Sequence, residues 1–162
     1  MIGLLILIAG CGGKSPTATQ ALSVNLVVNP APAAGDAAHP VILTAKARNT
    51  GLKTAWYSSQ CMGGPGIGLH VFGPDGAEVL IRDPFAQGPA CPDGYAPLQP
   101  AKSVQLIFEF TGVLYARSDE PSERIYPAPP GTYTAVVDFG FADQPGVSQF
   151  EIERSATFEW GP

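Results

Sequence analysis

Charge is scarce in this chain of 162 residues. Aspartate, glutamate, lysine and arginine together make up only 14% of the sequence, and nine basic against fourteen acidic residues give a formal net charge of −5. The Lys and Arg residues occur singly, so no run of positive charge is present to release counterions from phosphate. The composition argues against nucleic acid as a partner and against a general affinity for anionic lipid surfaces.

Residues that could carry catalysis or hold a metal are also few. His39 lies in an Ala/Pro-rich segment and His70 on a predicted strand, and neither has a nucleophile or a ligand pattern beside it in the sequence. Asp75 and Asp93 both precede a glycine, which is typical of turns and not of the spaced carboxylates of a calcium loop. We therefore expect no catalytic residues, no bound metal, no cofactor and no enzymatic activity.

Helical periodicity is absent, and alternation of apolar and polar residues takes its place. The 19 glycines and 17 prolines are spread along the chain, which favours many short strands separated by turns. The spacing predicts one all-β domain over residues 21–162, an immunoglobulin-like antiparallel β-sandwich of seven or eight strands. The predicted strands cover residues 22–29, 41–48, 54–59, 66–72, 77–82, 104–110, 133–141 and 150–160.

The N-terminus carries a short apolar run that ends in small residues and a cysteine. Residues 2–8 lead into Ile8-Ala9-Gly10-Cys11, and the run is shorter than the roughly 20 apolar residues that a membrane-spanning helix needs. This stretch resembles the lipobox of bacterial lipoproteins. The resemblance implies a signal peptide over residues 1–10, lipidation of Cys11 and a tether over residues 11–20. The alternative is that residues 1–8 form a buried strand.

The same resemblance predicts where the protein resides. A lipidated Cys11 would attach the domain to a membrane of the bacterial cell envelope, facing the periplasm or the cell surface. Gly12 stands where some lipoproteins have aspartate, and by resemblance to enterobacterial lipoproteins it permits sorting to the outer membrane if the cell has one. We expect that membrane, reached through the N-terminal lipid, to be one partner, and an envelope protein or a protease to be another.

With Cys11 acylated, two thiols remain in the chain. Cys61 and Cys91 both lie in Gly/Pro-rich segments, and two leftover cysteines in an oxidising compartment most simply form a disulfide. Closing that loop would stabilise the domain by roughly 3–4 kcal/mol in the loop-entropy model. The alternative is two separate buried thiols.

Several turn and strand-entry sequences resemble one known family. They resemble the Ig-like domain of BsuPI-type proteinase inhibitors and related bacterial lipoproteins over residues 22–141, and this resemblance implies the sandwich fold but not the inhibitory activity. Gln99 and Ala101 depart from the family's usual Leu-x-Pro-Gly-Glu. Tyr133 is expected to be a tyrosine-corner residue, whose hydroxyl ties down a loop. The motifs are Asn49-Thr50-Gly51, Val71-Phe72-Gly73-Pro74-Asp75-Gly76, Phe85, Leu98-Gln99-Pro100-Ala101 and Pro130-Gly131-Thr132-Tyr133.

One long segment without a strand pattern is the candidate for partner contact. It runs from Gly112 to Gly131, and unpatterned loops of this length are uncommon unless they bind something or are disordered. Tyrosine and arginine are favoured at interfaces, and Ile125 adds an apolar side chain. The contact site that we predict within the segment is Leu114, Tyr115, Arg117 and Tyr126. The function predicted is non-catalytic binding or structural support, and the alternative is a proteinase inhibitor that presents this loop. Trp56 is expected in the sandwich core.

Overall fold

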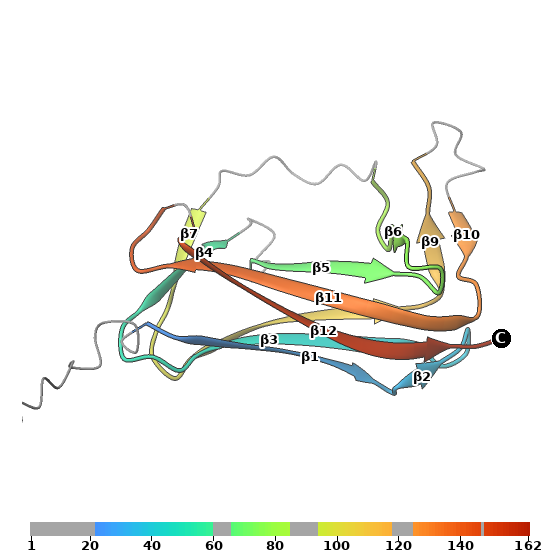
Figure 1. The fold of residues 1–162 in the computed structure, drawn as a ribbon, viewed down its shortest axis with the longest axis horizontal. Helices are drawn as coiled ribbons and strands as arrows, with labels where there is room; N and C mark the ends of the chain where they lie inside the picture. Colours follow the sequence, from blue (N-terminus) through green and yellow to red (C-terminus); the bar gives the residue numbers. More distant parts are fainter. Residues whose placement is uncertain (1–21, 60–65, 85–93, 118–124, 147) are drawn as a thin grey trace, which may run out of the picture.

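The computed structural model describes residues 22–59, 66–84, 94–117, 125–146 and 148–162, and all regular structure in these ranges is β-strand. Two sheets pack face to face, and a separate two-stranded hairpin stands at one end (Figure 1). No helix among the described residues is long and apolar enough to cross a membrane.

The first sheet has three antiparallel strands. Its order is β1 (Val24–Ala31), β3 (Val41–Asn49) and β8 (Ser103–Phe110). The register places Ala45 between Val28 and Leu106, so the apolar positions of the three alternating patterns share the inward face. The polar positions share the outward face.

The second sheet is built around the longest strand, β11 (Gly131–Ala142). One side of β11 pairs along its length with β12 (Phe150–Trp160), and the other side pairs with β5 (Ile67–Phe72) and, at its end, with β4 (Ala55–Ser59). Three further strands complete the sheet: β7 (Gly94–Leu98) on β4, β6 (Glu78–Val79) on β5, and β2 (Ala34–Gly35), which runs parallel to the end of β12.

This arrangement confirms the predicted immunoglobulin-like sandwich. The sheet β1-β3-β8 faces a sheet that contains β12-β11-β4, which matches the A-B-E and G-F-C strands of that fold. Seven of the eight predicted strands have counterparts of five or more residues, whereas the strand predicted over 77–82 is reduced to β6, two residues long. The prediction missed β7, because Pro97 lies within it and proline normally breaks a strand unless the strand lies at an edge.

The core lies between the two sheets in two adjoining clusters. At the hairpin end the ring of Phe110 lies 5.2 Å from Tyr133, 5.0 Å from Phe158 and 5.1 Å from Trp160 between centroids. At the opposite end the core contains Phe139 and small residues from both sheets, including Ala45 and Ala55. Such tilted and edge-on ring pairs add about 0.5–1.5 kcal/mol each beyond the burial of their area.

Tyr133 occupies the predicted tyrosine corner. Its side chain is fully buried, and its hydroxyl donates a hydrogen bond to the Pro129 carbonyl at 2.8 Å. The bond ties the connection that precedes β11 to the strand itself, as in other immunoglobulin-like domains.

The prediction that Trp56 is a core residue is wrong. Trp56 alternates with Ala55 and Tyr57, and Ala55 is fully buried, so the tryptophan points to the outer side of its sheet. Tyr57 packs inward instead, with its ring 5.5 Å from that of Phe139. The buried tryptophan of the sandwich is Trp160, from the last strand.

A buried asparagine joins the turn after β3 to β7. The amide nitrogen of Asn49 donates to the Lys53 and Leu98 carbonyls, each at 2.7 Å, and its amide oxygen accepts from the Gly51 N–H at 2.9 Å. Nearby, Ala101 adopts a φ of 64°, the left-handed conformation that favours glycine.

Candidate functional site

The two ends of the predicted contact loop form a β-hairpin. Strands β9 (Val113–Tyr115) and β10 (Ile125–Pro127) pair antiparallel, with Leu114 opposite Tyr126. In Figure 1 the pair stands across the direction of the main sheets, at one end of the sandwich. The expectation of a segment without regular structure is therefore wrong for these residues, while residues 118–124 lie outside the described ranges.

The hairpin is anchored to the sandwich at its base. The Ala128 N–H donates to the Gly112 carbonyl, and the Tyr115 N–H donates to the Leu80 carbonyl, both at 2.8 Å. Gly112 has a φ of 75°, and a Cβ at this position would overlap the indole ring of Trp160. Only glycine adopts this φ without strain and leaves room for the indole ring. Gly112 therefore allows the base of the hairpin to pack directly on the core.

The structure separates the four predicted contact residues. Leu114 is fully buried, belongs to the core cluster of Phe110 and lines the pocket described below. It lends the hairpin a hydrophobic anchor and would meet a partner only inside that pocket. Tyr115 is half-buried, whereas Arg117 and Tyr126 are exposed. Of the predicted set, Tyr115, Arg117 and Tyr126 stay available to a partner.

Sequence reasoning missed one exposed apolar residue on the hairpin, Val113, and left a second, Ile125, out of the predicted site. Val113 is 39% exposed and Ile125 is 60% exposed. By the alternation of side chains they lie on the face of the hairpin opposite to Leu114 and Tyr126. A strand pattern over 113–115 and 125–127 would have revealed them, but three residues are too few for period-two alternation to stand out.

A pocket of about 220 Å³ lies between the hairpin and the turn that joins β5 to β6. Pockets that bind whole metabolites are larger, about 300–1,000 Å³, whereas a cavity of about 150 Å³ already holds a benzene molecule. This pocket therefore suits one apolar side chain of a partner. Its lining residues are Gly73, Pro74, Asp75, Val79, Leu114, Tyr126, Pro129 and Tyr133.

The polar groups of the pocket come from two tyrosines and an aspartate. Burial raises the pKa of Tyr133, and the nearby Tyr126 and Asp75 raise it further. The Asp75 carboxylate accepts a hydrogen bond from the Ala77 N–H at 3.0 Å, which confirms the predicted role of Asp75 as a turn former. The pocket thus combines mostly apolar lining with phenol hydroxyls and one carboxylate.

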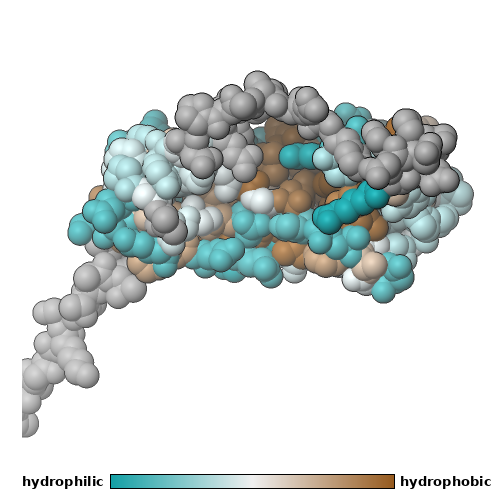
Figure 2. Space-filling view, turned by 90° about the horizontal axis from the view of Figure 1, so that it is seen from above, coloured by the Kyte–Doolittle hydropathy of each residue, from teal (hydrophilic) through white to brown (hydrophobic). Residues whose placement is uncertain are grey.

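The molecular surface around this site is markedly apolar. The face seen from above the ribbon, which includes β5 and β6, has apolar residues gathered in its middle and polar residues along its borders (Figure 2). Val79 and Ile81 are half-buried there and pack against the core cluster of Phe110. Patches of this kind frequently mark interaction sites.

The two histidines are paired with carboxylates on the surface. In His70 the Nδ1 atom lies 2.6 Å from Glu78 Oε1, and Nε2 lies 3.6 Å from Asp138 Oδ2. The hydrogen bond to Glu78 raises the pKa of His70. His39 Nδ1 lies 3.1 Å from Asp36 Oδ1, and the Ala38 N–H that donates to Asp36 lowers the pKa of this carboxyl.

These pairs do not assemble into a metal centre. Among the described residues, no three His, Cys, Asp or Glu side chains are placed to hold a metal ion. The three cysteines, Cys11, Cys61 and Cys91, lie outside the described ranges, so lipidation and disulfide formation stay predictions.

Comparisons with known proteins give structural similarity alone. No family model matches the chain, and no curated protein matches it. Among solved structures, a β-glucosidase from Erythrobacter marinus is 13% identical with a TM-score of 0.43, over 86% of this chain and 16% of the other. A β-glucosidase from Listeria innocua in complex with glucose is 11% identical with a TM-score of 0.44, over 87% of this chain and 16% of the other.

A third similar structure is DesR, a β-glucosidase from Streptomyces venezuelae, which is 11% identical with a TM-score of 0.39 over 85% of this chain and 15% of the other. This chain therefore spans only a small part of the length of these enzymes. The class that its own strand order defines is the all-β immunoglobulin-like sandwich.

Proposed function

We propose that this chain is an exported, lipid-anchored immunoglobulin-like domain that binds a partner at the bacterial cell envelope without catalysing a reaction. The observation that carries the binding role is the hairpin β9–β10. It presents exposed Val113 and Ile125 on one face and places Tyr126 at an apolar pocket on the other. Exposed apolar residues beside a pocket are the usual composition of an interface centre.

The pocket limits what the partner can be. Its volume of about 220 Å³ admits one branched or aromatic side chain, and Tyr126 at 39% exposure can close over such a side chain. The half-buried Tyr115 and the exposed Arg117 continue the surface beyond the pocket. A protein or peptide that inserts one apolar side chain fits this geometry better than a small metabolite does.

The test is photo-crosslinking in bacterial cells that make the full chain. A benzophenone amino acid replaces Tyr126 in one variant and Tyr95 in the control, since the two tyrosines are 39% and 42% exposed. Tyr95 lies on β7, away from the hairpin. We expect a discrete adduct from position 126 and none of that size from position 95. Equal adducts from both positions, or none from 126, would contradict the proposal.

A specific observation favours a second candidate, the proteinase inhibitor. Strands β9 and β10 stand across the sandwich, so the end of the hairpin at which Tyr115 pairs with Ile125 points away from the main sheets (Figure 1). A protease could engage that end. The discriminating experiment is a panel of serine, cysteine and metalloproteases: inhibition that is lost when residues 118–124 are replaced by a Gly/Ser linker favours this candidate.

In this proposal the domain is attached to the membrane through a lipid on Cys11. Expression of the full chain with labelled palmitate should label the protein, and Cys11→Ser should abolish the label and release the domain from membranes. Labelling that persists in Cys11→Ser would contradict the lipoprotein proposal, because the resemblance assigns the lipid to this residue alone.

The disulfide proposal has an independent test. Trypsin cuts after Lys53, Arg82 and Lys102, so Cys61 and Cys91 fall in different peptides. Mass spectrometry of the non-reduced digest should find these two peptides linked. Free thiols at both positions in freshly isolated protein would contradict the bond.

A further inference from the structure

The fold gathers basic residues that are scattered in the sequence. Lys46 and Arg48 lie on β3, and both are exposed. Arg48 pairs in register with Ser103, directly after the exposed Lys102. Lys53 is also exposed, and its carbonyl accepts a hydrogen bond from the Asn49 side chain. Arg48, Lys53 and Lys102 therefore lie at one end of the three-stranded sheet, and Lys46 lies two positions from Arg48, on the same outward face of β3.

The described chain begins at this same end. The Ser23 carbonyl accepts hydrogen bonds from the Thr50 N–H at 2.8 Å and the Gly51 N–H at 3.0 Å. Figure 1 shows that β1 starts here, whereas the hairpin β9–β10 and the C-terminus lie at the other end. The lysines thus surround the point at which the chain leads back toward Cys11.

A large apolar side chain is exposed next to these basic residues. Leu52 lies in the turn between β3 and β4 and is 85% exposed, the highest value among the large hydrophobic residues that are described as exposed. Lys53 follows it directly. An exposed leucine beside basic residues is the composition of a segment that enters the interface of a membrane.

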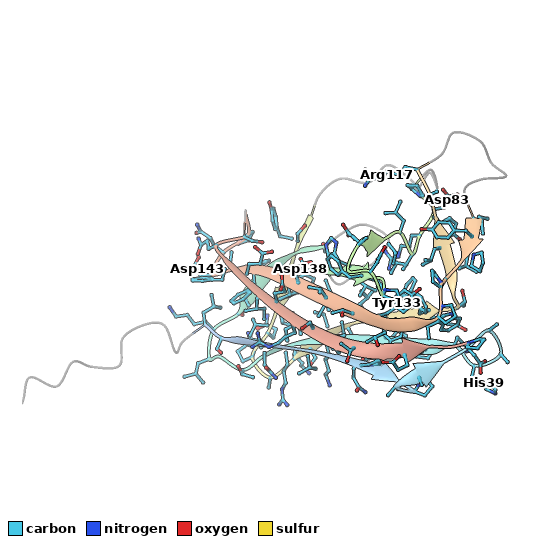
Figure 3. The ribbon with its side chains drawn as sticks, turned by 45° about the vertical axis from the view of Figure 1, so that its right-hand side comes forward. His39, Asp83, Arg117, Tyr133, Asp138 and Asp143 are labelled. Carbon is cyan, nitrogen blue, oxygen red and sulfur yellow. The ribbon has the colours of Figure 1, made fainter. Side chains whose placement is uncertain are left out.

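Acidic residues are absent from the segments that form this end of the three-stranded sheet. Residues 22–31, 41–53 and 97–105 contain no aspartate or glutamate. Asp143 and Glu151 belong to the connection between β11 and β12 and to β12 itself, in the second sheet. Figure 3 places Asp143 on that side of the molecule. The charge is therefore divided between the two layers.

The proposed anchor is close enough for this end to reach a membrane. Ten residues lie between Cys11 and Leu22, and the chain from one to the other spans at most about 36–40 Å when fully extended. A lipid at Cys11 would hold Leu52 and the lysines within that distance of the headgroups. Encounters with the surface are then intramolecular and frequent.

We propose that the end formed by Lys46, Arg48, Lys53 and Lys102 docks on anionic phospholipid, with Leu52 inserted among the headgroups. This docking rests on the proposed lipid anchor at Cys11. It also orients the domain on the membrane, so that the hairpin β9–β10 points away from the bilayer. The net charge of −5 does not oppose the docking, because potentials fall off within about 8–10 Å in physiological salt and the local residues decide.

The size of the effect follows from the number of basic residues. One Lys or Arg near an anionic surface changes the docked-to-free ratio about fivefold. Reversal of two of the four, in Lys53→Glu/Lys102→Glu, should therefore lower this ratio at least about 25-fold. Salt at about 0.5 M should lower it too, since screening weakens surface electrostatics.

The test uses the fluorescence of a Leu52→Trp variant on vesicles of brominated phosphatidylcholine. Full-length lipidated protein is compared on vesicles with and without 30% phosphatidylglycerol, and wild type corrects for Trp56 and Trp160. A second arm holds the chain from Gly12 onward by an N-terminal His tag on a nickel-chelating lipid. We expect quenching with phosphatidylglycerol and little without it, in both arms.

The control variant is Arg82→Glu/Arg154→Glu. It changes the net charge by the same amount as Lys53→Glu/Lys102→Glu, but Arg82 lies over the Phe108 ring and Arg154 lies on β12. The lysine reversal should abolish quenching, and the control should retain it. Circular dichroism verifies that both variants fold.

The lipidated protein and the His-tagged protein together distinguish failure of the docking from failure of the lipid anchor at Cys11. Equal quenching on both kinds of vesicle, or equal loss in both double variants, overturns the docking whatever happens at Cys11. Failure of Cys11 to incorporate palmitate, together with lipid-dependent quenching in the His-tagged arm, overturns the lipid anchor and leaves the docking supported.

Discussion

Removal of the Asn49 side chain amide should destabilise the domain by far more than its small size suggests. Asn49 is completely buried, and its amide nitrogen donates to two carbonyls at 2.7 Å. Asn49→Ala deletes both donors. The Gly51 N–H loses one acceptor but keeps its bond to the Ser23 carbonyl. The cost therefore comes mainly from the carbonyls of Lys53 and Leu98.

The magnitude follows from how exposed these two carbonyls are. Leu98 is only 2% exposed, so its unpaired carbonyl should cost about 1–3 kcal/mol. Lys53 is exposed, so water replaces much of its lost bond and the cost there is about 1 kcal/mol or less. We expect Asn49→Ala to lower the free energy of unfolding by about 1–4 kcal/mol, equivalent to a fall in Tm of roughly 3–12 °C for a domain of this size.

The assay is urea unfolding followed by circular dichroism, with Thr50→Ala as the matched control. Thr50 is the exposed neighbour in the same turn, and its hydroxyl bonds to the Ser23 hydroxyl at 3.0 Å; its loss should cost less than about 1 kcal/mol. If Asn49→Ala costs no more than Thr50→Ala, the buried amide does not hold the turn and the reasoning is refuted.

Three further predictions concern the corner, the hairpin base and the surface histidine. Tyr133→Phe keeps the ring but removes its hydrogen bond, so it should cost about 0.5–1.5 kcal/mol in chemical unfolding. Gly112→Ala should cost about 1–3 kcal/mol, because of its φ of 75° and the overlap with an indole ring; a neutral effect would contradict the anchoring of the hairpin. The raised pKa of His70 means that its pairing stabilises the fold fully below its ordinary pKa, and that this stability is lost as pH rises through the folded pKa. NMR titration of Glu78→Gln should show a lower pKa for His70, and an unchanged value would refute the pairing.

The sequence predicted the sandwich because alternation is a local property. In β3, Val41, Leu43, Ala45 and Ala47 follow every second position, and the structure buries all four. Turn residues were equally reliable at Asp75, where a carboxylate bonds the main chain two residues on. Pattern reasoning failed for β7, where a proline lies in an edge strand.

The candidate site was predictable only in outline. Gly112 and Gly131 correctly bound the segment, since both have positive φ and both lie against other parts of the chain. Residues inside it could not be sorted into buried and exposed, because the strands of the hairpin are three residues long. The burial of Leu114 depends on Tyr133 and Trp160, which come from distant strands.

The sequence by itself determined the fold class, the faces of the long strands and the tyrosine corner, because these depend on neighbours one to four residues away. Tertiary structure alone decided three things: the pocket beneath Tyr126, the inward position of Leu114, and the gathering of Lys46, Lys53 and Lys102 at one end. These features join residues far apart in the chain, and strand register brings such residues together only when the packing of the whole core selects it.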